Sequence, residues 1–246
     1  MDFDGSLHRT KAVASKPAVL FLHGVRASKD IWASQLAAAH AAGYQVLAID
    51  LPGHGVEPEV EHFSLADAFS AIDDALARDA SSKPVVLVGL SLGGYTALAY
   101  AATHPDAPLA GIVAAGCAGE PKWKMLSAYR VLAGTANAGY HHSVKTLRRL
   151  RHVPEPEPMP PWALVTDALR ELAGHSTKAD IRAIKAPIWF VNGALDPLRL
   201  QNREFTHLAQ NGASVIIPNA GHDVNTDQPE LFNQVLVRAL NEFSSQ

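Results

Sequence analysis

Six short apolar runs alternate with helix-like segments along most of the chain, and this alternation constrains the fold more strongly than any other sequence feature. Continuous apolar runs of this length are typical of strands buried on both faces, as in a parallel sheet covered by helices. The chain is therefore predicted to form an α/β fold with a doubly wound, mostly parallel sheet. The predicted strands cover residues 18–23, 44–50, 84–89, 109–116, 187–193 and 213–219.

Segments with a helix-like pattern lie between these strands. Ser64 precedes the second of them and is a predicted N-cap, and Asp227 or Gln228 lies near the start of the last. Residues 7–14 are predicted to add an antiparallel edge strand. The predicted helices cover residues 29–42, 65–78, 92–103, 199–210 and 229–243.

The alternation stops once, between residues 120 and 186, where the sequence carries no strand signal. Helix-compatible pieces remain at 122–132, 143–150 and 162–172, and the stretch VPEPEPMPP between the last two holds five prolines in nine residues. Such a stretch cannot form a regular helix or a central strand. We therefore predict a core domain of residues 1–119 and 187–246, with residues 120–186 as a helical insertion over the sheet.

The charge balance argues against a polyanionic partner. The formal net charge is −3, and the densest basic stretch, KTLRRLR at 145–151, is expected to be a solvated helix face. We therefore expect the chain not to bind nucleic acid.

Cysteine content and the lengths of apolar runs indicate the compartment. Cys117 is the single cysteine, which excludes an intrachain disulfide and a cysteine-based metal cluster. The first residues, MDFDGSLHR, carry two acids and no apolar run, unlike a secretory signal peptide. No apolar stretch reaches the roughly 18 residues of a membrane span. We expect a soluble, cytoplasmic protein without a membrane partner, acting as a monomer or homodimer, although a secreted enzyme without disulfides would have the same cysteine content.

The stretch VVLVGLSLGGYTALAYAATHP, at 85–105, places a serine between a buried strand and an alanine-rich helix. A tight strand-to-helix turn strains the backbone of its apex residue and needs neighbours without bulk, which Gly89 and Gly93 provide. Ser91 is thereby presented at the carboxyl end of the sheet, where open α/β sheets bind ligands. The N–H of Leu92, at the helix start, favours negative charge there. Gly-x-Ser-x-Gly predicts a nucleophile, although the same pattern also marks ordinary turns.

A candidate base and a candidate acid follow two later strands. His222, in NAGHDVN, comes after the last predicted strand, on a loop at the same sheet edge as Ser91. Asp196, in NGALDPL, follows the strand that ends at Gly193, where a carboxylate can accept from the imidazole and set its tautomer. Taken alone, Asp196 is more simply a turn residue before proline. The order Ser91, Asp196, His222, with each residue after a different strand, predicts a catalytic triad.

With these motifs the sequence resembles the α/β-hydrolase family over nearly the whole chain. FLHG at 21–24 looks like the family's His-Gly oxyanion motif, DLPGHG at 50–55 like its next loop, and GLSLGG like its nucleophile elbow. GALDP and AGH match the acid and base positions. The residues before the His-Gly motif are fewer than the family usually has, which leaves the family's first edge strand open.

The resemblance implies further roles. The backbone N–H groups of Val25 and Leu92 would form the oxyanion hole, and residues 120–186 would be a helical cap inserted after the sixth family strand. His23 would shape the oxyanion loop, and His54 would be a turn residue. A serine nucleophile also separates this chain from the epoxide hydrolases and haloalkane dehalogenases of the fold, which use aspartate.

The predicted activity is hydrolysis of carboxylic esters through an acyl-enzyme intermediate, with no metal and no organic cofactor. We expect a carboxylesterase-type serine hydrolase for small to medium, mostly apolar ester substrates. For several apolar side chains a substrate pocket and simple packing of the cap are both open interpretations. The pocket residues predicted are Trp123, Met125, Trp162 and Leu195, with Leu198 beside the acid.

Other functions fit the same residues. The triad also supports cleavage of lactones, thioesters or carbon–carbon bonds of diketones, and perhydrolysis. A hydrolase-like ligand receptor and a scaffolding protein are alternatives of another class, since folds are shared among functions. Cys117 is a second conceivable nucleophile, but no base is evident beside it, which favours a buried thiol.

Overall fold

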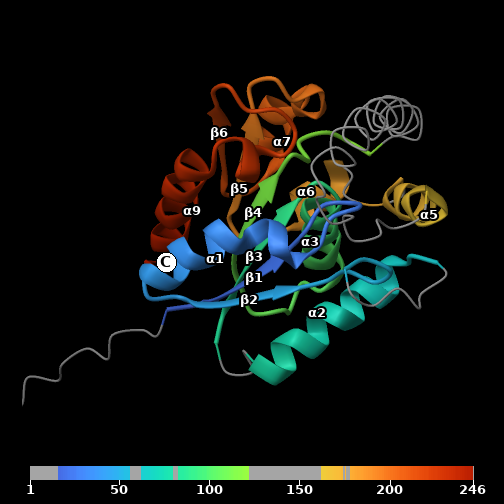
Figure 1. The fold of residues 1–246 in the computed structure, drawn as a ribbon, viewed down its shortest axis with the longest axis horizontal. Coiled ribbons are helices and arrows are strands. Elements are labelled where there is room, and N and C mark those ends of the chain that lie inside the picture. The colour runs from blue at the N-terminus through green and yellow to red at the C-terminus, as the bar shows by residue number, and fades with distance from the viewer. Residues whose placement is uncertain are drawn as a thin grey trace, which may run out of the picture.

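The computed structural model describes residues 16–55, 62–79, 83–121, 162–173, 175 and 178–245. Within them, six parallel strands form one sheet in the order β2-β1-β3-β4-β5-β6 (Figure 1). All six predicted strands are confirmed, close to their predicted bounds, whereas the predicted strand at residues 7–14 lies outside the described residues. The strands are β1 (Ala18–Leu22), β2 (Gln45–Ile49), β3 (Val85–Leu90), β4 (Leu109–Ala115), β5 (Ile188–Gly193) and β6 (Gly212–Ile217).

Helices connect the strands, largely where the sequence predicts them. The predicted helix at 29–42 is a 3₁₀ turn followed by an α-helix, and the one predicted at 199–210 begins only at Asn202. The helical elements are η1 (Lys29–Trp32), α1 (Ala33–Ala41), α2 (Leu65–Asp79), α3 (Leu92–Thr103), α5 (Trp162–Leu172), α6 (Lys178–Ala183), η2 (Pro197–Arg199), α7 (Asn202–Leu208), α8 (Val224–Asp227) and α9 (Pro229–Phe243).

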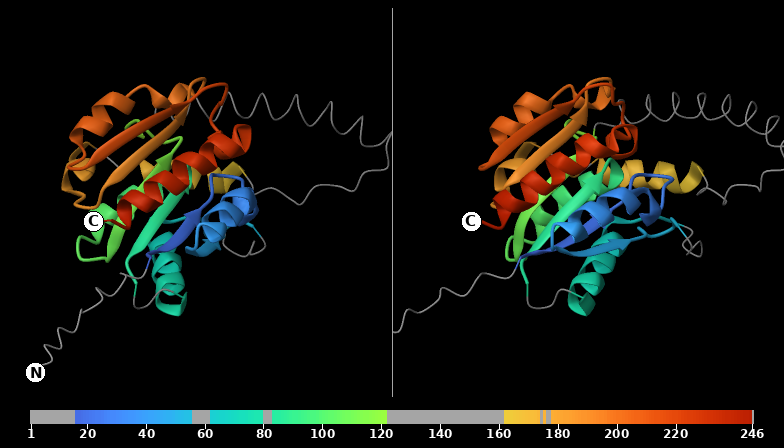
Figure 2. Two further views of the ribbon diagram at one scale, coloured as in Figure 1. Left: turned by 90° about the vertical axis from the view of Figure 1, so that its left-hand side faces the viewer. Right: turned by 60° about the vertical axis from the view of Figure 1, so that its left-hand side comes forward.

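In strands β1 to β5, successive residues contact opposite layers of the core. In β1, Leu20 and Leu22 belong to the cluster that includes side chains of α2, α3, α6 and α7. Val19 and Phe21 belong instead to the cluster formed with α1 and α9. These two helices lie side by side on one face of the sheet (Figure 2). These strands are therefore covered on both faces, which explains their continuously apolar sequences, whereas the edge strand β6 exposes Ser214 and Ile216.

The segment between β4 and β5 supplies helix α5, which matches the helix predicted at 162–172. Helix α5 contacts α2 and α3, and its Leu164 packs against Gly53 in the loop after β2. In the following helix α6, Ile181 is fully buried in the same cluster as α3. The helices predicted at 122–132 and 143–150 lie outside the described residues, and the division into core and cap stays a prediction.

The ends of two helices test the predicted caps. Ser64 is confirmed as a cap of α2, because its Oγ accepts a hydrogen bond from the Asp67 N–H at 3.1 Å. Helix α9 begins at Pro229 without a side-chain cap at Gln228. Asp227 instead accepts a hydrogen bond from the N–H of Gly221, at 2.7 Å, and so ties down the loop that carries His222.

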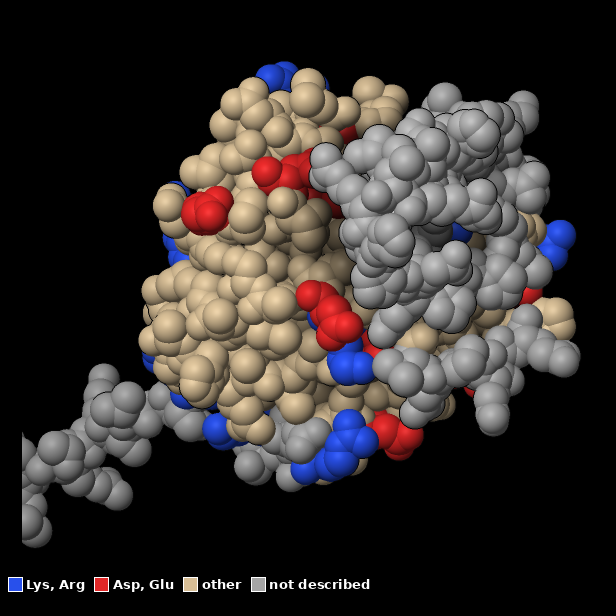
Figure 3. Space-filling view, in the orientation of Figure 1, with Lys and Arg blue, Asp and Glu red and all other residues tan. Residues whose placement is uncertain are grey.

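Two surface properties bear on possible partners. On the face shown in Figure 3, Lys and Arg side chains lie in small separate groups, interspersed with Asp and Glu. Among the described residues, no helix combines the length and the apolar character needed to cross a bilayer.

Candidate active site

The turn between β3 and α3 holds Ser91 in a strained conformation. Its backbone has φ 51° and ψ −112°, in the left-handed half of conformational space that side-chain-bearing residues rarely adopt. A Cβ on Gly89 would lie 2.3 Å from the carbonyl carbon of Gly93, and a Cβ on Gly93 would lie 2.1 Å from the Leu22 oxygen. Both glycines are therefore required by the close backbone approach at this turn, as the sequence predicts.

The structure brings Ser91, His222 and Asp196 together at the carboxyl edge of the sheet. His222 Nε2 lies 2.8 Å from Ser91 Oγ, and His222 Nδ1 lies 3.1 Å from Asp196 Oδ2. Because the carboxylate only accepts, Nδ1 carries the ring proton and Nε2 accepts from the serine hydroxyl. Asp196 is buried, Ser91 is 8% exposed, and the His222 side chain is 14% exposed.

Asp196 is itself held in place by the turn it begins. Its Oδ1 accepts a hydrogen bond from the Leu198 N–H at 2.9 Å, capping η2, while Oδ2 faces the imidazole. The turn role and the contact with His222, two interpretations open in the sequence, are thus both present. With one oxygen committed to the backbone, the carboxylate keeps a single orientation toward the ring.

The two predicted oxyanion donors flank the serine. Val25 follows Gly24 in the loop after β1, and Leu92 is the first residue of α3. Neither backbone N–H donates to an acceptor among the described residues. Ser91, Val25 and Leu92 also share the wall of one small cavity. The arrangement leaves two backbone donors beside the hydroxyl.

Two cavities meet at Ser91, and their walls differ in character. The larger, of about 170 Å³, is lined by residues that include His222 and Asp223 of the loop after β6 and Thr226 of α8. The smaller, of about 20 Å³, is lined almost wholly by apolar side chains. Its wall is made of Val25, Ser91, Leu92, Tyr95, Ala168, Leu169, Leu172 and Leu198.

Of the predicted pocket residues within the described part of the chain, the structure places only Leu198 on a cavity wall at Ser91. Trp123 and Met125 lie outside the described residues, and so does the side chain of Trp162, although α5 begins there. Leu195 is 73% exposed and lines neither of the two cavities at Ser91, so its pocket role stays a prediction. Leu198 does line the smaller one.

Three residues of α5, together with Tyr95 of α3, were not singled out from the sequence. Ala168, Leu169 and Leu172 face Ser91 from one side of α5. Their spacing of three and four residues is the signal that could have found them within the predicted helix.

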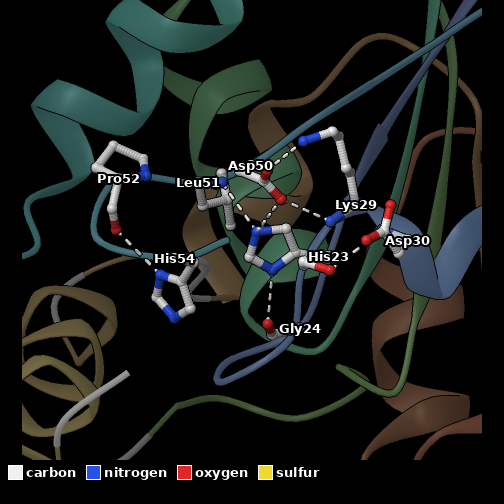
Figure 4. A network of polar contacts seen from close by, with 9 residues as sticks. His23, Gly24, Lys29, Asp30, Asp50, Leu51, Pro52 and His54 are labelled. Atoms are coloured by element: carbon white, nitrogen blue, oxygen red, sulfur yellow. Dashed lines mark hydrogen bonds and ion pairs between the residues drawn. The ribbon is translucent and has the colours of Figure 1, made fainter. Parts of the chain in front are cut away.

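A polar network joins the loop after β1 to the segment after β2 (Figure 4). His23, fully buried, accepts the Leu51 N–H at Nε2, 2.9 Å away, and Nδ1 lies 2.7 Å from the Gly24 oxygen. Nδ1 therefore carries the proton and donates to that carbonyl. Asp50 Oδ1 accepts the backbone N–H of Lys29 at 2.7 Å, and Oδ2 forms an ion pair with the Lys29 ammonium. This carboxylate contact was missed from the sequence.

Burial and hydrogen bonding shift the pKa values of this network. Burial, more than any other influence, lowers the pKa of His23 to about 4. His54, whose Nδ1 contacts the Pro52 oxygen at 3.0 Å, also has a pKa lowered mainly by burial. Burial alone would raise the pKa of Asp50, but hydrogen bonds from the side chain and backbone of Lys29 outweigh it and lower that pKa. Both histidines are therefore neutral at pH 7, beside an ionised Asp50.

Cys117 lies at the end of β4 and is fully buried. Burial raises the pKa of its thiol well above the ordinary value. The side chain is thus kept as a neutral thiol, in agreement with the sequence interpretation. Among the described residues, no group of three or more His, Cys, Asp or Glu side chains is arranged to hold a metal ion.

Comparison with known proteins agrees with this fold. The model of the alpha/beta hydrolase family matches residues 19–235. An esterase of Mycobacterium tuberculosis is 28% identical over 94% of this chain and 85% of its own length. A pimeloyl-[acyl-carrier protein] methyl ester esterase of Neisseria meningitidis is 29% identical over 87% of this chain and 90% of its own.

A solved structure supports the fold alone. The putative non-heme bromoperoxidase of Mycobacterium tuberculosis superposes with a TM-score of 0.74 at 20% identity, covering 94% of each chain. Since the family model spans most of the sequence, the chain belongs to the α/β-hydrolase family. It is a hydrolase with the open, parallel sheet of that fold.

Proposed function

We propose that this protein hydrolyses carboxylic esters through an acyl-enzyme formed on Ser91. One observation carries the proposal: an unbroken line of hydrogen bonds runs from Ser91 Oγ through the His222 ring to Asp196. The nucleophile, its base and the group that orients the base are thus within hydrogen-bonding distance of one another before any substrate enters. The esterases among the relatives support an ester as the substrate.

The reaction follows from these contacts. Ser91 Oγ attacks the ester carbonyl while His222 Nε2 takes its proton, and Asp196 stabilises the imidazolium that results. The carbonyl oxygen becomes an oxyanion, which the N–H groups of Val25 and Leu92 stabilise by about 3 kcal/mol each. Collapse of the tetrahedral intermediate expels the alcohol, which receives the proton from His222. Water then repeats the sequence, releasing the carboxylic acid and free Ser91.

The two cavities orient the substrate. The leaving alcohol must lie beside His222, which protonates it, and His222 lines the larger cavity but not the smaller one. The acyl group accordingly occupies the smaller, apolar cavity, next to the two proposed oxyanion donors. A space of about 20 Å³ suits an acyl chain of very few carbons. We propose short-chain esters, with the bulkier part of the substrate on the alcohol side.

Hydrolysis of p-nitrophenyl acetate and butyrate tests the mechanism. Ser91→Ala should lose at least about a thousandfold in kcat, since the nucleophile is removed. Ser214→Ala, at an exposed position of β6, is the matched control and should keep wild-type rates. A fluorophosphonate should label the peptide that contains Ser91 in the wild type and in the control. Equal rates for Ser91→Ala and wild type would exclude the serine mechanism, and a burst without turnover would favour a ligand receptor.

A further inference from the structure

The loop that carries Val25 is attached to the rest of the molecule at both of its ends. At its start, His23 accepts the Leu51 N–H and donates to the Gly24 carbonyl. At its end, the backbone N–H of Lys29 donates to Asp50 Oδ1. Both attachments come from consecutive residues, Asp50 and Leu51, of the segment after β2 (Figure 4).

The two attachments meet at Asp50. Its Oδ1, which accepts the Lys29 N–H, lies 3.8 Å from His23 Nε2, and its side chain is only 12% exposed. The Asp50 carboxylate also leaves no room for a side chain at position 55. A Cβ on Gly55 would lie 2.2–2.6 Å from the carboxylate atoms. Gly55 has φ 67°, so both the backbone conformation and the close approach require glycine there. The segment after β2 thus folds around a carboxylate aimed at the neighbouring loop.

Between the attachments lies a turn with an unusual backbone conformation. Ala27 donates to the Gly24 oxygen at 3.2 Å, and Arg26 has a positive φ of 59°. A turn with a residue in this conformation persists only where its surroundings enforce it. The bond from Lys29 to Asp50 supplies that constraint at the end of the loop.

We propose that Asp50 is a positioning residue that keeps the Val25 N–H aimed at the oxyanion, by holding the backbone N–H of Lys29. This inference rests on the proposed function, because it assigns Asp50 a part in the same reaction. The Lys29–Asp50 ion pair is a separate contact, made by the other carboxylate oxygen to a side chain that is 42% exposed. The backbone bond, and not the ion pair, carries the positioning.

Two substitutions at position 29 separate the two contacts. Lys29→Ala removes the ammonium and keeps the N–H, whereas Lys29→Pro removes both. Proline suits this position, because Lys29 is the first residue of η1 and Ser28 is extended, with φ −131° and ψ 173°. At position 50, Asp50→Asn keeps an oxygen that can accept the N–H, and Asp50→Ala does not.

The variants should fall into two groups, according to whether the hydrogen bond from the Lys29 N–H to residue 50 is kept. Lys29→Ala and Asp50→Asn should stay within about threefold of wild-type kcat. Lys29→Pro and Asp50→Ala should lose between about 10- and 100-fold in kcat with little change in KM, since a misplaced donor weakens only the transition state. Their affinity for a trifluoromethyl ketone, whose adduct carries an oxyanion, should fall by the same factor.

Hydrogen–deuterium exchange of residues 23–31 gives a readout that does not depend on activity. Exchange should be faster in Lys29→Pro and Asp50→Ala than in Lys29→Ala, with the peptides around Asp196 and His222 unchanged. Thermal unfolding checks that every variant is folded at the assay temperature. If Asp50→Ala does not fold, Lys29→Pro alone tests the loss of the backbone hydrogen bond. Equal losses in Lys29→Ala and Lys29→Pro, or full kcat in Lys29→Pro, would overturn the proposal. Should Ser91→Ala match wild type, the proposed function fails instead, and the exchange data still decide whether Asp50 orders the loop.

Discussion

The two sides of Ser91 are built by different forces. On the side of Val25, the loop after β1 is held by hydrogen bonds from Leu51 and to Asp50, at 2.9 and 2.7 Å. On the side of the smaller cavity, α5 presents the apolar residues Ala168, Leu169 and Leu172. Hydrogen bonds are directional and hydrophobic contacts are not. The side that we propose to stabilise charge is therefore fixed by directional bonds, and the side that we propose to hold the acyl group by apolar packing.

The largest effect is expected at Asp196. Asp196→Asn should lower kcat/KM about 10⁴-fold, because an amide can hold the imidazole in the wrong tautomer. Asp74→Asn, which alters an exposed carboxylate of α2 that lines neither cavity at Ser91, should stay within about threefold and is the matched control. Steady-state hydrolysis of p-nitrophenyl acetate measures both. A loss below about tenfold in Asp196→Asn would remove this residue from the mechanism.

The hydrogen-bonded network of His23, Asp50 and His54 should make the free energy of unfolding depend on pH. Since the pKa of His23 falls from 6.5 to about 4 on folding, the unfolded chain binds more protons between these values. The free energy of unfolding should therefore decrease by about 3 kcal/mol as pH falls from about 7 to 4. His54 adds to the decrease in the same direction. The lowered pKa of Asp50 places its own contribution at lower pH, below the usual carboxyl range.

Urea unfolding at a series of pH values measures this dependence. His23→Gln should flatten the slope between pH 4 and 7, whatever its effect on overall stability. His40→Gln, at an exposed position of α1, should keep the wild-type slope. A wild-type slope in His23→Gln would show that another group is responsible.

On the apolar side, a substitution should change selectivity more than catalysis. Leu169→Ala enlarges the smaller cavity, so the ratio of kcat/KM for butyrate over acetate should rise about tenfold. Arg170→Ala changes the adjacent residue of α5, whose side chain is 65% exposed, and should leave the ratio unchanged. An unchanged ratio in Leu169→Ala would place the acyl group elsewhere.

The smallest effect concerns how α5 is attached. Glu171 accepts the Leu65 N–H at the start of α2, 3.1 Å away, so it acts as a cap supplied by another helix. Glu171→Ala should lower the free energy of unfolding by about 1 kcal/mol, and Glu171→Gln, which keeps an acceptor, by less. Chemical denaturation compares the two. Identical losses would mean that the acceptor oxygen does not stabilise the helix start.

Much of the fold could be predicted because its signals are local. The strands were recognised from contiguous apolar runs, and the cap of α2 from Ser64 directly before the helix. The turn at Ser91 was predicted from the two glycines that flank it, and the structure shows why each is needed. The split of residues 29–42 into η1 and α1 was missed, since an amphipathic pattern does not distinguish a 3₁₀ turn from the α-helix that continues it.

Half of the residues that line the smaller cavity were missed from the sequence. Large side chains such as tryptophan and methionine were chosen as pocket residues. The sequence does not distinguish Ala168 and Leu169 from other buried helix residues, because their role depends on how α5 packs. Leu195, beside the acid in sequence, is largely exposed, because the turn at Asp196 directs Leu198 inward instead. Sequence proximity to a functional residue does not determine which side chain faces the site.

The amino-acid sequence by itself determined the layered α/β fold, the strained turn at Ser91 and the order of the three candidate site residues. Burial patterns and turn conformations depend on residues that are close in the sequence, so they can be predicted from the sequence. Only the tertiary structure decided the 2.8 Å contact between His222 and Ser91, the bond from Lys29 to Asp50, and the face of α5 that meets the serine. These contacts join residues far apart in the chain, and their distances depend on how the strands and helices pack together.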